Sequence, residues 1–395
     1  MKKKKQSSRK TRRLDQSAKD TCCSVPCHSV PIDKVDKNLD STMCEGVRNK
    51  SFSIAVVATM SAGKSTLLNS LIGKRLLPSR NEACTATVCR VEDVDILQEF
   101  EGRSKVKGCW QDWKSPIARE DVERWNDSKV DEIELRGNLP WIANTADDYR
   151  VLLIDTPGPN NSTNIDHARI TENILKSSDF SLLIFVINAE TPGTDDEWSF
   201  LNKICSVLKG RGHRAQIIFA LNKIDKIDPE KAETIAGVLR NRMNQFRSIG
   251  FEKPVMVPVF GDLAVRIREA MRLKQAYRMR RNGPKPRAHT FGKLYEAVGS
   301  VRSLCALRSD IELVLGAKSF YREGLNLTSE VANALKRCDH RRLSDSEKKD
   351  MLLVGGRFFR FSDIRAAEKL SGVPVLETLL EAHLDQFANA ERKMK

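Results

Sequence analysis

A short polar loop between an apolar strand and an apolar helix has the residue types of a phosphate-binding site. Residues 58–65 read Ala-Thr-Met-Ser-Ala-Gly-Lys-Ser and follow the apolar, partly β-branched run 54–57. In such a loop consecutive backbone N–H groups point at a β-phosphate, aided by the positive end of the following helix. Gly63 lets the backbone approach the phosphate oxygens, whereas Ala58 stands where the motif usually has its first glycine. The stretch predicts binding of a nucleoside triphosphate.

The side chains of this loop fit the same chemistry. We expect Lys64 to reach the β- and γ-phosphates and the Ser65 hydroxyl to bind Mg²⁺. The predicted nucleotide-binding residues of the loop are Ser61, Ala62, Gly63, Lys64, Ser65 and Thr66.

Two further motifs follow apolar runs in the order that a guanine-nucleotide site requires. Asp155-Thr-Pro-Gly158 comes after the apolar run 149–154, and Asn222-Lys-Ile-Asp225 comes after 215–221. In the Asp-Thr-Pro-Gly motif we expect the carboxylate of Asp155 to hold the hydration shell of Mg²⁺. The N–H group of Gly158 is expected to contact the γ-phosphate. Asp225 can accept two hydrogen bonds from N1–H and the exocyclic amine of guanine, which adenine cannot offer. We therefore expect Asn222, Lys223 and Asp225 to bind the guanine base.

A segment after the first helix supplies the last candidate. Residues 76–87 are polar and helix-breaking, and Thr85 lies near their end. This segment could close over the γ-phosphate and place Thr85 on the metal. The predicted metal ligands are Ser65, Thr85 and Asp155, and the predicted catalytic residues are Lys64, Ser61 and Thr85.

The elements that must position these residues alternate between strands and helices. Apolar or alternating runs predict strands at 54–57, 88–96, 132–136, 149–154, 180–187, 215–221 and 255–260. Helical patterns are expected near 166–177, 195–209 and 229–248. The charged segment 102–128, which contains three tryptophans, is expected to be a helical insertion. This alternation predicts a doubly wound α/β domain with a mostly parallel central sheet and with ligands at the carboxyl ends of its strands.

Changes in composition predict four parts of the chain. Residues 1–50 are expected to be a disordered basic tail, 51–262 the nucleotide-binding core, 263–370 a basic and helical segment, and 371–395 a final helix. Residues 301–395 are expected to be helical throughout, and the last helix carries an apolar stripe of Leu376, Leu379, Leu380, Leu384 and Phe387.

The net charge of +15 favours an anionic partner, either nucleic acid or an acidic membrane surface. Eight of the first 13 residues are Lys or Arg, and they form the candidate membrane-binding arm. No apolar run approaches the ~20 residues that span a bilayer, and the basic N-terminus lacks the apolar core of a secretory signal. The 10 cysteines are then reduced thiols, and the expected location is cytoplasmic, with a possible peripheral attachment to membrane.

Four stretches together resemble the dynamin superfamily, and bacterial dynamin-like proteins in particular. They are Thr-Met-Ser-Ala-Gly-Lys-Ser-Thr (59–66), Leu-Leu-Pro-Ser-Arg-Asn-Glu-Ala-Cys-Thr (76–85), Leu-Leu-Ile-Asp-Thr-Pro-Gly-Pro-Asn (152–160) and Leu-Asn-Lys-Ile-Asp (221–225). Residues 371–384 also look like the closing helix of that family's GTPase domain. The resemblance implies that the core 51–262 is a dynamin-type GTPase domain, that 263–370 is an insertion and that the final helix closes this domain. It also implies Mg²⁺-dependent hydrolysis of GTP to GDP and phosphate, stimulated when two GTPase domains pair as a homodimer.

Two positions depart from the family's pattern. Met60 stands where dynamins usually carry a glutamine that helps to position the attacking water. Pro159 stands where Ras-type enzymes carry the glutamine that orients this water. A guanine-nucleotide switch or scaffold with little turnover is therefore an alternative. The basic charge leaves a second alternative, an RNA- or ribosome-associated GTPase, although no base-stacking module accompanies it.

Overall fold

The computed structural model describes residues 50–59, 61–78, 87–142, 149–157, 175, 180–190, 193–211, 216–226, 242–279, 351–354, 357–360, 368–369 and 371–393. All of them belong to the unit Gly46–Lys395.

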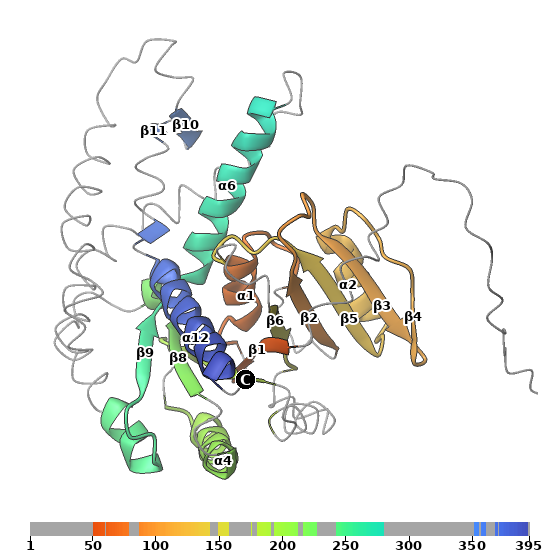
Figure 1. Cartoon of the computed structure of the whole chain (residues 1–395). Coiled ribbons are helices and arrows are strands. Elements are labelled where there is room, and N and C mark those ends of the chain that lie inside the picture. The colour runs from red at the N-terminus through yellow and green to blue at the C-terminus, as the bar shows by residue number, and fades with distance from the viewer. Residues whose placement is uncertain are drawn as a thin grey trace, which may run out of the picture. The chain divides into compact units, whose positions relative to one another are not determined.

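A nine-stranded sheet runs through the domain in the order β4-β3-β5-β2-β6-β1-β7-β8-β9 (Figure 1). Its strands are β1 (Lys50–Ala58), β2 (Val88–Asp93), β3 (Glu101–Val106), β4 (Cys109–Trp110), β5 (Glu132–Gly137), β6 (Tyr149–Asp155), β7 (Leu182–Asn188), β8 (Gln216–Asn222) and β9 (Val255–Pro258). From β6 to β9 every neighbouring pair is parallel, whereas β2 runs antiparallel to β6. The predicted α/β class with a mostly parallel sheet is confirmed.

The helices cover both faces of the parallel strands. They are α1 (Lys64–Ile72), α2 (Arg119–Asp127), α4 (Asp195–Arg211), α6 (Gly261–Met279) and α12 (Val373–Lys393), and residues 242–249 are helical as well. Helices α1, α6 and α12 share one core cluster with Ile54, Val56 and Ile184. On the other face Phe185 contacts Phe200 of α4, and Phe219 stacks on Phe246 of the helix 242–249. This two-sided burial explains why all seven residues of β7 are buried and why all but Asn188 are apolar.

Most predicted elements are confirmed within a few residues. The strands expected at 54–57, 88–96, 132–136, 149–154, 180–187, 215–221 and 255–260 correspond to β1, β2, β5, β6, β7, β8 and β9. The closing helix is α12, which buries Leu376, Leu380 and Leu384 and packs Leu379 and Phe387 against the core. The helix expected near 166–177 lies outside the described residues, apart from Leu175, which is helical.

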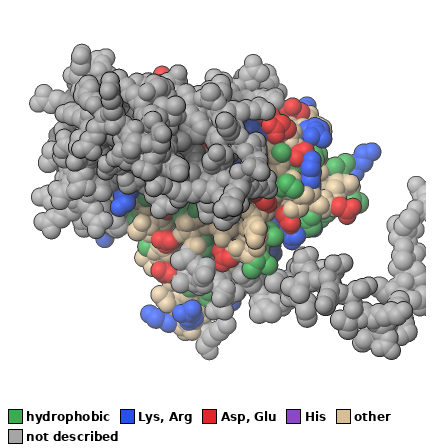
Figure 2. Space-filling view, turned by 90° about the horizontal axis from the view of Figure 1, so that it is seen from above, with side chains coloured by type: hydrophobic (Ala, Val, Ile, Leu, Met, Phe, Trp, Pro, Cys, Tyr) green, Lys and Arg blue, Asp and Glu red, His purple; other side chains and the backbone are tan. Residues whose placement is uncertain are grey.

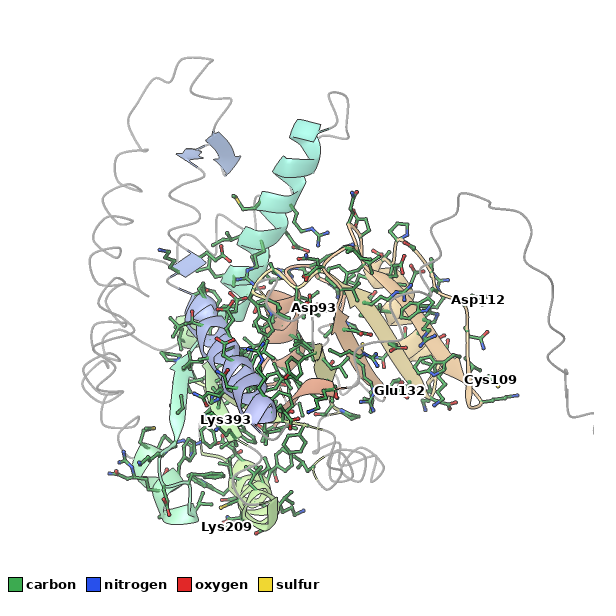
Figure 3. The ribbon with its side chains drawn as sticks, viewed as in Figure 1. Asp93, Cys109, Asp112, Glu132, Lys209 and Lys393 are labelled. Atoms are coloured by element: carbon green, nitrogen blue, oxygen red, sulfur yellow. The ribbon has the colours of Figure 1, made fainter. Side chains whose placement is uncertain are left out.

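The prediction of a helical insertion at 102–128 is wrong for its first half. Residues 101–106 and 109–110 are strands β3 and β4, and only α2 is helical; Cys109 and Asp112 mark the outer end of this sheet (Figure 3). Charged residues of β3 alternate with buried Gly102 and Ser104, the two-residue period of a half-buried strand. Cross-strand ion pairs, Arg103 with Glu134 and Arg136 with Glu101, satisfy those charges.

The expectation of helix throughout 301–395 is also corrected. Residues Met351–Val354 and Arg357–Arg360 form an antiparallel pair, β10 and β11. Their sequences, Met-Leu-Leu-Val and Arg-Phe-Phe-Arg, are rich in apolar and aromatic side chains that suit a strand. The predicted division between residues 262 and 263 falls inside α6, and the four-part division of the chain stays a prediction. In the part of the chain that the structure describes, no helix combines the length and the apolar character that crossing a membrane requires.

Candidate nucleotide-binding site

The three motifs meet at one edge of the sheet. They follow the ends of β1 at Ala58, of β6 at Asp155 and of β8 at Asn222. These strands are parallel, and β6 and β1 are neighbours while only β7 separates β1 from β8. Ligands of open α/β sheets bind at this edge, so the order of the strands brings the phosphate loop between the other two motifs.

The backbone of the phosphate loop needs left-handed conformations. Ser61 has φ 59° and Gly63 has φ 84°, and Gly63 precedes the first residue of α1. A Cβ atom on Gly63 would lie 2.5 Å from Nδ2 of Asn222, a distance that no real Cβ contact tolerates. Glycine is therefore required at position 63 both by its dihedral angle and by the close approach of a neighbouring motif.

Lys64 and Asp155 form an ion pair beside the loop. The amine of Lys64 donates to Oδ1 of Asp155, and both residues are buried, with exposed fractions of 8% and 1%. Burial raises the pKa of Asp155, and the charge of Lys64 opposes that rise. The Thr156 hydroxyl donates to the carbonyl of Val56 at 2.8 Å, which fixes the end of β6 to β1.

The second oxygen of Asp155 fits a magnesium site. Oδ2 is buried and has no hydrogen-bond partner within the described segments. Carboxylate and hydroxyl oxygens are the ligands that Mg²⁺ accepts, usually together with waters and phosphate oxygens. Asp155 with the Ser65 hydroxyl, in the first turn of α1, supplies this donor set.

Asn222 ties three parts of the site together. Its Nδ2 donates to the carbonyls of Ala62 at 3.0 Å and Gly63 at 3.3 Å, and its Oδ1 accepts from the N–H of Gly261 at 3.2 Å. The sequence had suggested a contact between Asn222 and the base, but not this bond to the phosphate loop. The amide side chain fixes the loop relative to β8 and to the start of α6.

Gly261 belongs to the stretch Phe260-Gly261-Asp262, where the sequence alone did not allow a base-contacting motif to be assigned. Besides its bond to Asn222, a Cβ atom there would lie 3.2 Å from Cα of Leu67 in α1. A small residue is needed where α6 begins because the backbone of α1 passes so close. The glycine at a strand–helix junction was the only signal in the sequence.

The other residues predicted to recognise the base lie directly after β8. Lys223 has φ 63°, and its amine is 3.8 Å from Oε2 of Glu190. Asp225 lies in the short 3₁₀ turn Ile224–Lys226, and its side chain is 11% exposed. Burial raises the pKa of Asp225, with the charge of Lys226 opposing. The carboxylate is thus sheltered from water, as a group that reads a base must be.

Some predicted site residues lie outside the described residues. These are Thr85 and Gly158, together with Met60 and Pro159. Of the other candidates, Ser61 is exposed while Ser65 and Thr66 are half-buried on the first turn of α1.

Comparison with known proteins shows which families this part of the chain resembles. The family model described as "Dynamin family" matches residues 54–224. A bacterial dynamin-like protein of Nostoc punctiforme is 29% identical over 210 residues, which are 49% of this chain and 28% of that protein. The GTPase Era of Actinobacillus pleuropneumoniae is 25% identical over 188 residues, covering 46% of this chain and 41% of that protein.

A solved structure of an oligomerised bacterial dynamin pair is also similar. It shares 15% sequence identity with a TM-score of 0.42, over 73% of this chain and 45% of the other. The chain spans less than half the length of the curated relatives it matches, 28% and 48% of the first two. Residues 54–224 contain the first two motifs and the first three residues of the third, and this part of the chain is similar to the GTPase domain of the dynamin family.

Proposed function

We propose that this chain hydrolyses GTP to GDP and phosphate with Mg²⁺. The observation that carries the proposal is the meeting of Lys64, Asp155 and Asn222 around one phosphate loop at the carboxyl edge of the sheet. In this proposal the loop residues 61–66 bind the phosphates, and Asn222, Lys223 and Asp225 bind guanine. Ser65, Thr85 and Asp155 hold the metal, and the N–H group of Gly158 contacts the γ-phosphate.

Catalysis would be mainly electrostatic. Bound Mg²⁺ would neutralise charge that develops on the transferring phosphoryl group. Lys64 would leave Asp155 and donate to the β- and γ-phosphates, while the loop N–H groups hold the β-phosphate. Water attacks the γ-phosphorus, the bond to the β–γ bridging oxygen breaks, and GDP leaves with that oxygen.

Pairing of two GTPase domains would complete the site. Neither Met60 nor Pro159 has a side chain that can orient water, so an isolated protomer lacks part of the apparatus that GTPases use. We propose that a homodimer orders the segment around Thr85 and thereby stimulates hydrolysis. Activity per protomer should rise with protein concentration, and a GTP transition-state analogue should promote a dimer that GDP does not.

Phosphate release over a hundredfold range of protein concentration, with light scattering in parallel, tests this. The variant Thr85→Ala should remove both the concentration dependence and the analogue-induced dimer. Flat activity without a dimer would contradict the pairing mechanism. Wild-type protein that binds GTP but performs less than one turnover would favour the alternative, a nucleotide switch or scaffold, which Met60 and Pro159 suggest.

A separate proposal concerns the anionic partner. We propose that it is an acidic membrane surface, which the basic residues within 1–13 would bind. On the face shown in Figure 2 the cationic and anionic side chains of the described residues are interspersed, without a patch of one sign. The sequence provides the basis of the proposal, because the positive charges at residues 2–13 can each contribute up to ~1 kcal/mol near an anionic bilayer. Deleting residues 2–13 should abolish sedimentation with anionic vesicles at low salt. Unchanged sedimentation would contradict this, and loss of ribosome co-purification instead would favour the RNA alternative.

A further inference from the structure

A buried arginine of α6 connects the helix of the phosphate loop with the closing helix. Arg268 donates from Nη1 to the carbonyl of Ser70 at 2.5 Å, at the last turn of α1. It also makes a bidentate contact with Glu377 of α12, at 2.6 and 2.9 Å, and its Nε donates to Glu368 at 2.6 Å. The side chains of Arg268 and Glu377 are only 12% and 10% exposed.

The bond to Ser70 acts on the helix whose other end carries Lys64. The carbonyl of Ser70 also accepts from the N–H of Gly73 at 3.2 Å, so Arg268 is a second donor at this helix end, and a cation there complements the helix dipole. Helix α1 has nine residues, so it is about 13.5 Å long and behaves as one rigid element. A shift at Ser70 therefore moves the N-terminal turn, where Lys64 and Ser65 lie.

The closing segment also contacts the opposite end of the site. The N–H of Phe260 donates to the carbonyl of Ser371 at 2.6 Å, and the next residue, Gly261, donates to Asn222. Asn222 in turn holds the carbonyls of Ala62 and Gly63. Ser371 is thus linked to the phosphate loop through Phe260, Gly261 and Asn222, and Glu377 is linked to the far end of α1 through Arg268.

Stability alone does not account for a charge cluster at this place. A buried arginine–glutamate pair usually contributes no more stability than apolar side chains of the same size. What the pair does provide is a fixed orientation of the arginine. Because carboxylates hold the planar guanidinium on two sides, its N–H group that faces Ser70 is kept at a fixed angle.

We infer that Arg268 is a positioning residue for the phosphate-binding loop, and that Glu377 of α12, by holding Arg268, makes the closing helix part of the nucleotide site. The inference rests on the proposed GTP-binding function. It predicts that Arg268, which lies about one helix length from the phosphates, affects the affinity for GDP and GTP alike, because both nucleotides contain the β-phosphate.

The test compares two arginines that bond to acids nearby. Arg75, just beyond α1, pairs with Asp262 and Glu269 of α6 at 3.1 and 2.9 Å, but bonds to neither α1 nor α12 in the described structure. Arg268→Met and Arg75→Met are titrated with fluorescent GDP and GTP well below their unfolding temperatures. We expect Arg268→Met to raise both dissociation constants about tenfold, and Arg75→Met to leave them within about twofold.

A rescue series separates positioning from mere support of the fold. Arg268→Lys keeps one donor and should bind nucleotide with intermediate affinity, and Glu377→Gln should also weaken it. Wild-type affinity in a folded Arg268→Met with a lowered melting temperature would overturn the inference, since the arginine would then only stabilise. If Arg268→Met does not fold, wild-type affinity in both Arg268→Lys and Glu377→Gln would overturn it, and weakened binding in both would support it. Wild-type protein that binds no GTP would overturn the proposed function itself, and this inference with it.

Discussion

Lys64 and Asp155 are paired in the interior, the first residue of α1 with the last residue of β6. The two side chains are 9% and 1% exposed, so neither charge can be left alone at low cost. The same two residues are the proposed ligands of the phosphates and of the metal shell. The pair therefore serves the fold and the site at once, and experiments must separate these contributions.

Replacing first Lys64 and then both Lys64 and Asp155 separates the contribution of the pair to stability from its contribution to nucleotide binding. Lys64→Met leaves the carboxylate of Asp155 buried without its cation and should lower the free energy of unfolding by about 3–5 kcal/mol. The double variant Lys64→Met/Asp155→Asn should recover most of that loss, because no buried charge remains. Nucleotide binding should be lost in both. Urea unfolding and titration with fluorescent GDP measure the two effects, and a double variant that binds like wild type would remove Lys64 and Asp155 from the site.

Two glycines with similar dihedral angles test the contact between the phosphate loop and Asn222. Gly63 and Gly108 have φ 84° and 80°, but a Cβ atom on Gly108 would meet nothing within 4 Å. Gly108→Ala should cost only the backbone strain, about 1–2 kcal/mol, and leave GTP binding unchanged. Gly63→Ala should cost more, because the methyl group displaces the side chain of Asn222, and should abolish GTP binding. Equal thermal shifts with retained binding would mean that Asn222 does not fix the loop.

The sequence predicted the central sheet and its site because both depend on local patterns. A short apolar run such as 180–187 favours a strand that is covered on both faces, and each motif directly follows an apolar run. The parallel order of the strands then brings the motifs to one edge without further information.

What the sequence did not predict depends on contacts between distant segments. The charges of Glu101 and Arg103 look like a helical surface until their partners on β5, Arg136 and Glu134, are known. The contacts of Asn222 with Ala62, and of Arg268 with Glu377, join residues 160 and 109 positions apart. No periodicity connects such residues, so only the fold shows them together.

Asp121 of α2 gives the β3–β5 region a measurable pH dependence. The pKa of Asp121 is lowered below its usual value. Burial acts to raise this pKa, but the hydrogen bonds that the carboxylate accepts from Lys114 and from the N–H of Ala118 outweigh burial. A carboxyl with a lowered pKa in the folded state stabilises the fold above its unfolded pKa of about 3.9, and that stability is lost as the pH falls through the lower folded value.

Asp121→Asn should therefore be less stable than wild type by about 1 kcal/mol at neutral pH, with the difference shrinking below about pH 4. Urea unfolding at the two pH values measures this. Asp112→Asn, at an exposed position of the same region, is the matched control and should match wild type at both. A stability difference that is constant with pH would show that the ionised form of Asp121 contributes nothing.

Recognition of guanine by Asp225 gives two predictions, the first on the choice of nucleotide. Asp225→Asn replaces one acceptor with a donor, which faces the N1–H and amine donors of guanine. GTP should bind more weakly, and the xanthine nucleotide, which has an oxygen in place of the amine, should bind better. The two nucleotides share their phosphates, so a variant that only disturbed the phosphate loop would lose both alike. ATP binding as tight as GTP in the wild type would contradict the assignment.

The same residue predicts how binding depends on pH. Burial raises the pKa of Asp225, so it takes up a proton at a higher pH than an exposed aspartate does. Guanine needs the ionised carboxylate, so a proton must leave before GTP binds, and affinity should fall as the pH is lowered through that raised pKa. Titrations with fluorescent GTP, as the pH is lowered from neutral through the range in which carboxylates take up protons, should show this loss in wild type. The weaker GTP binding of Asp225→Asn, measured with the same nucleotide, should have a flatter profile, since an amide does not titrate. Equal pH profiles for the two proteins would assign the titration to another group and leave Asp225 without a role in reading the base.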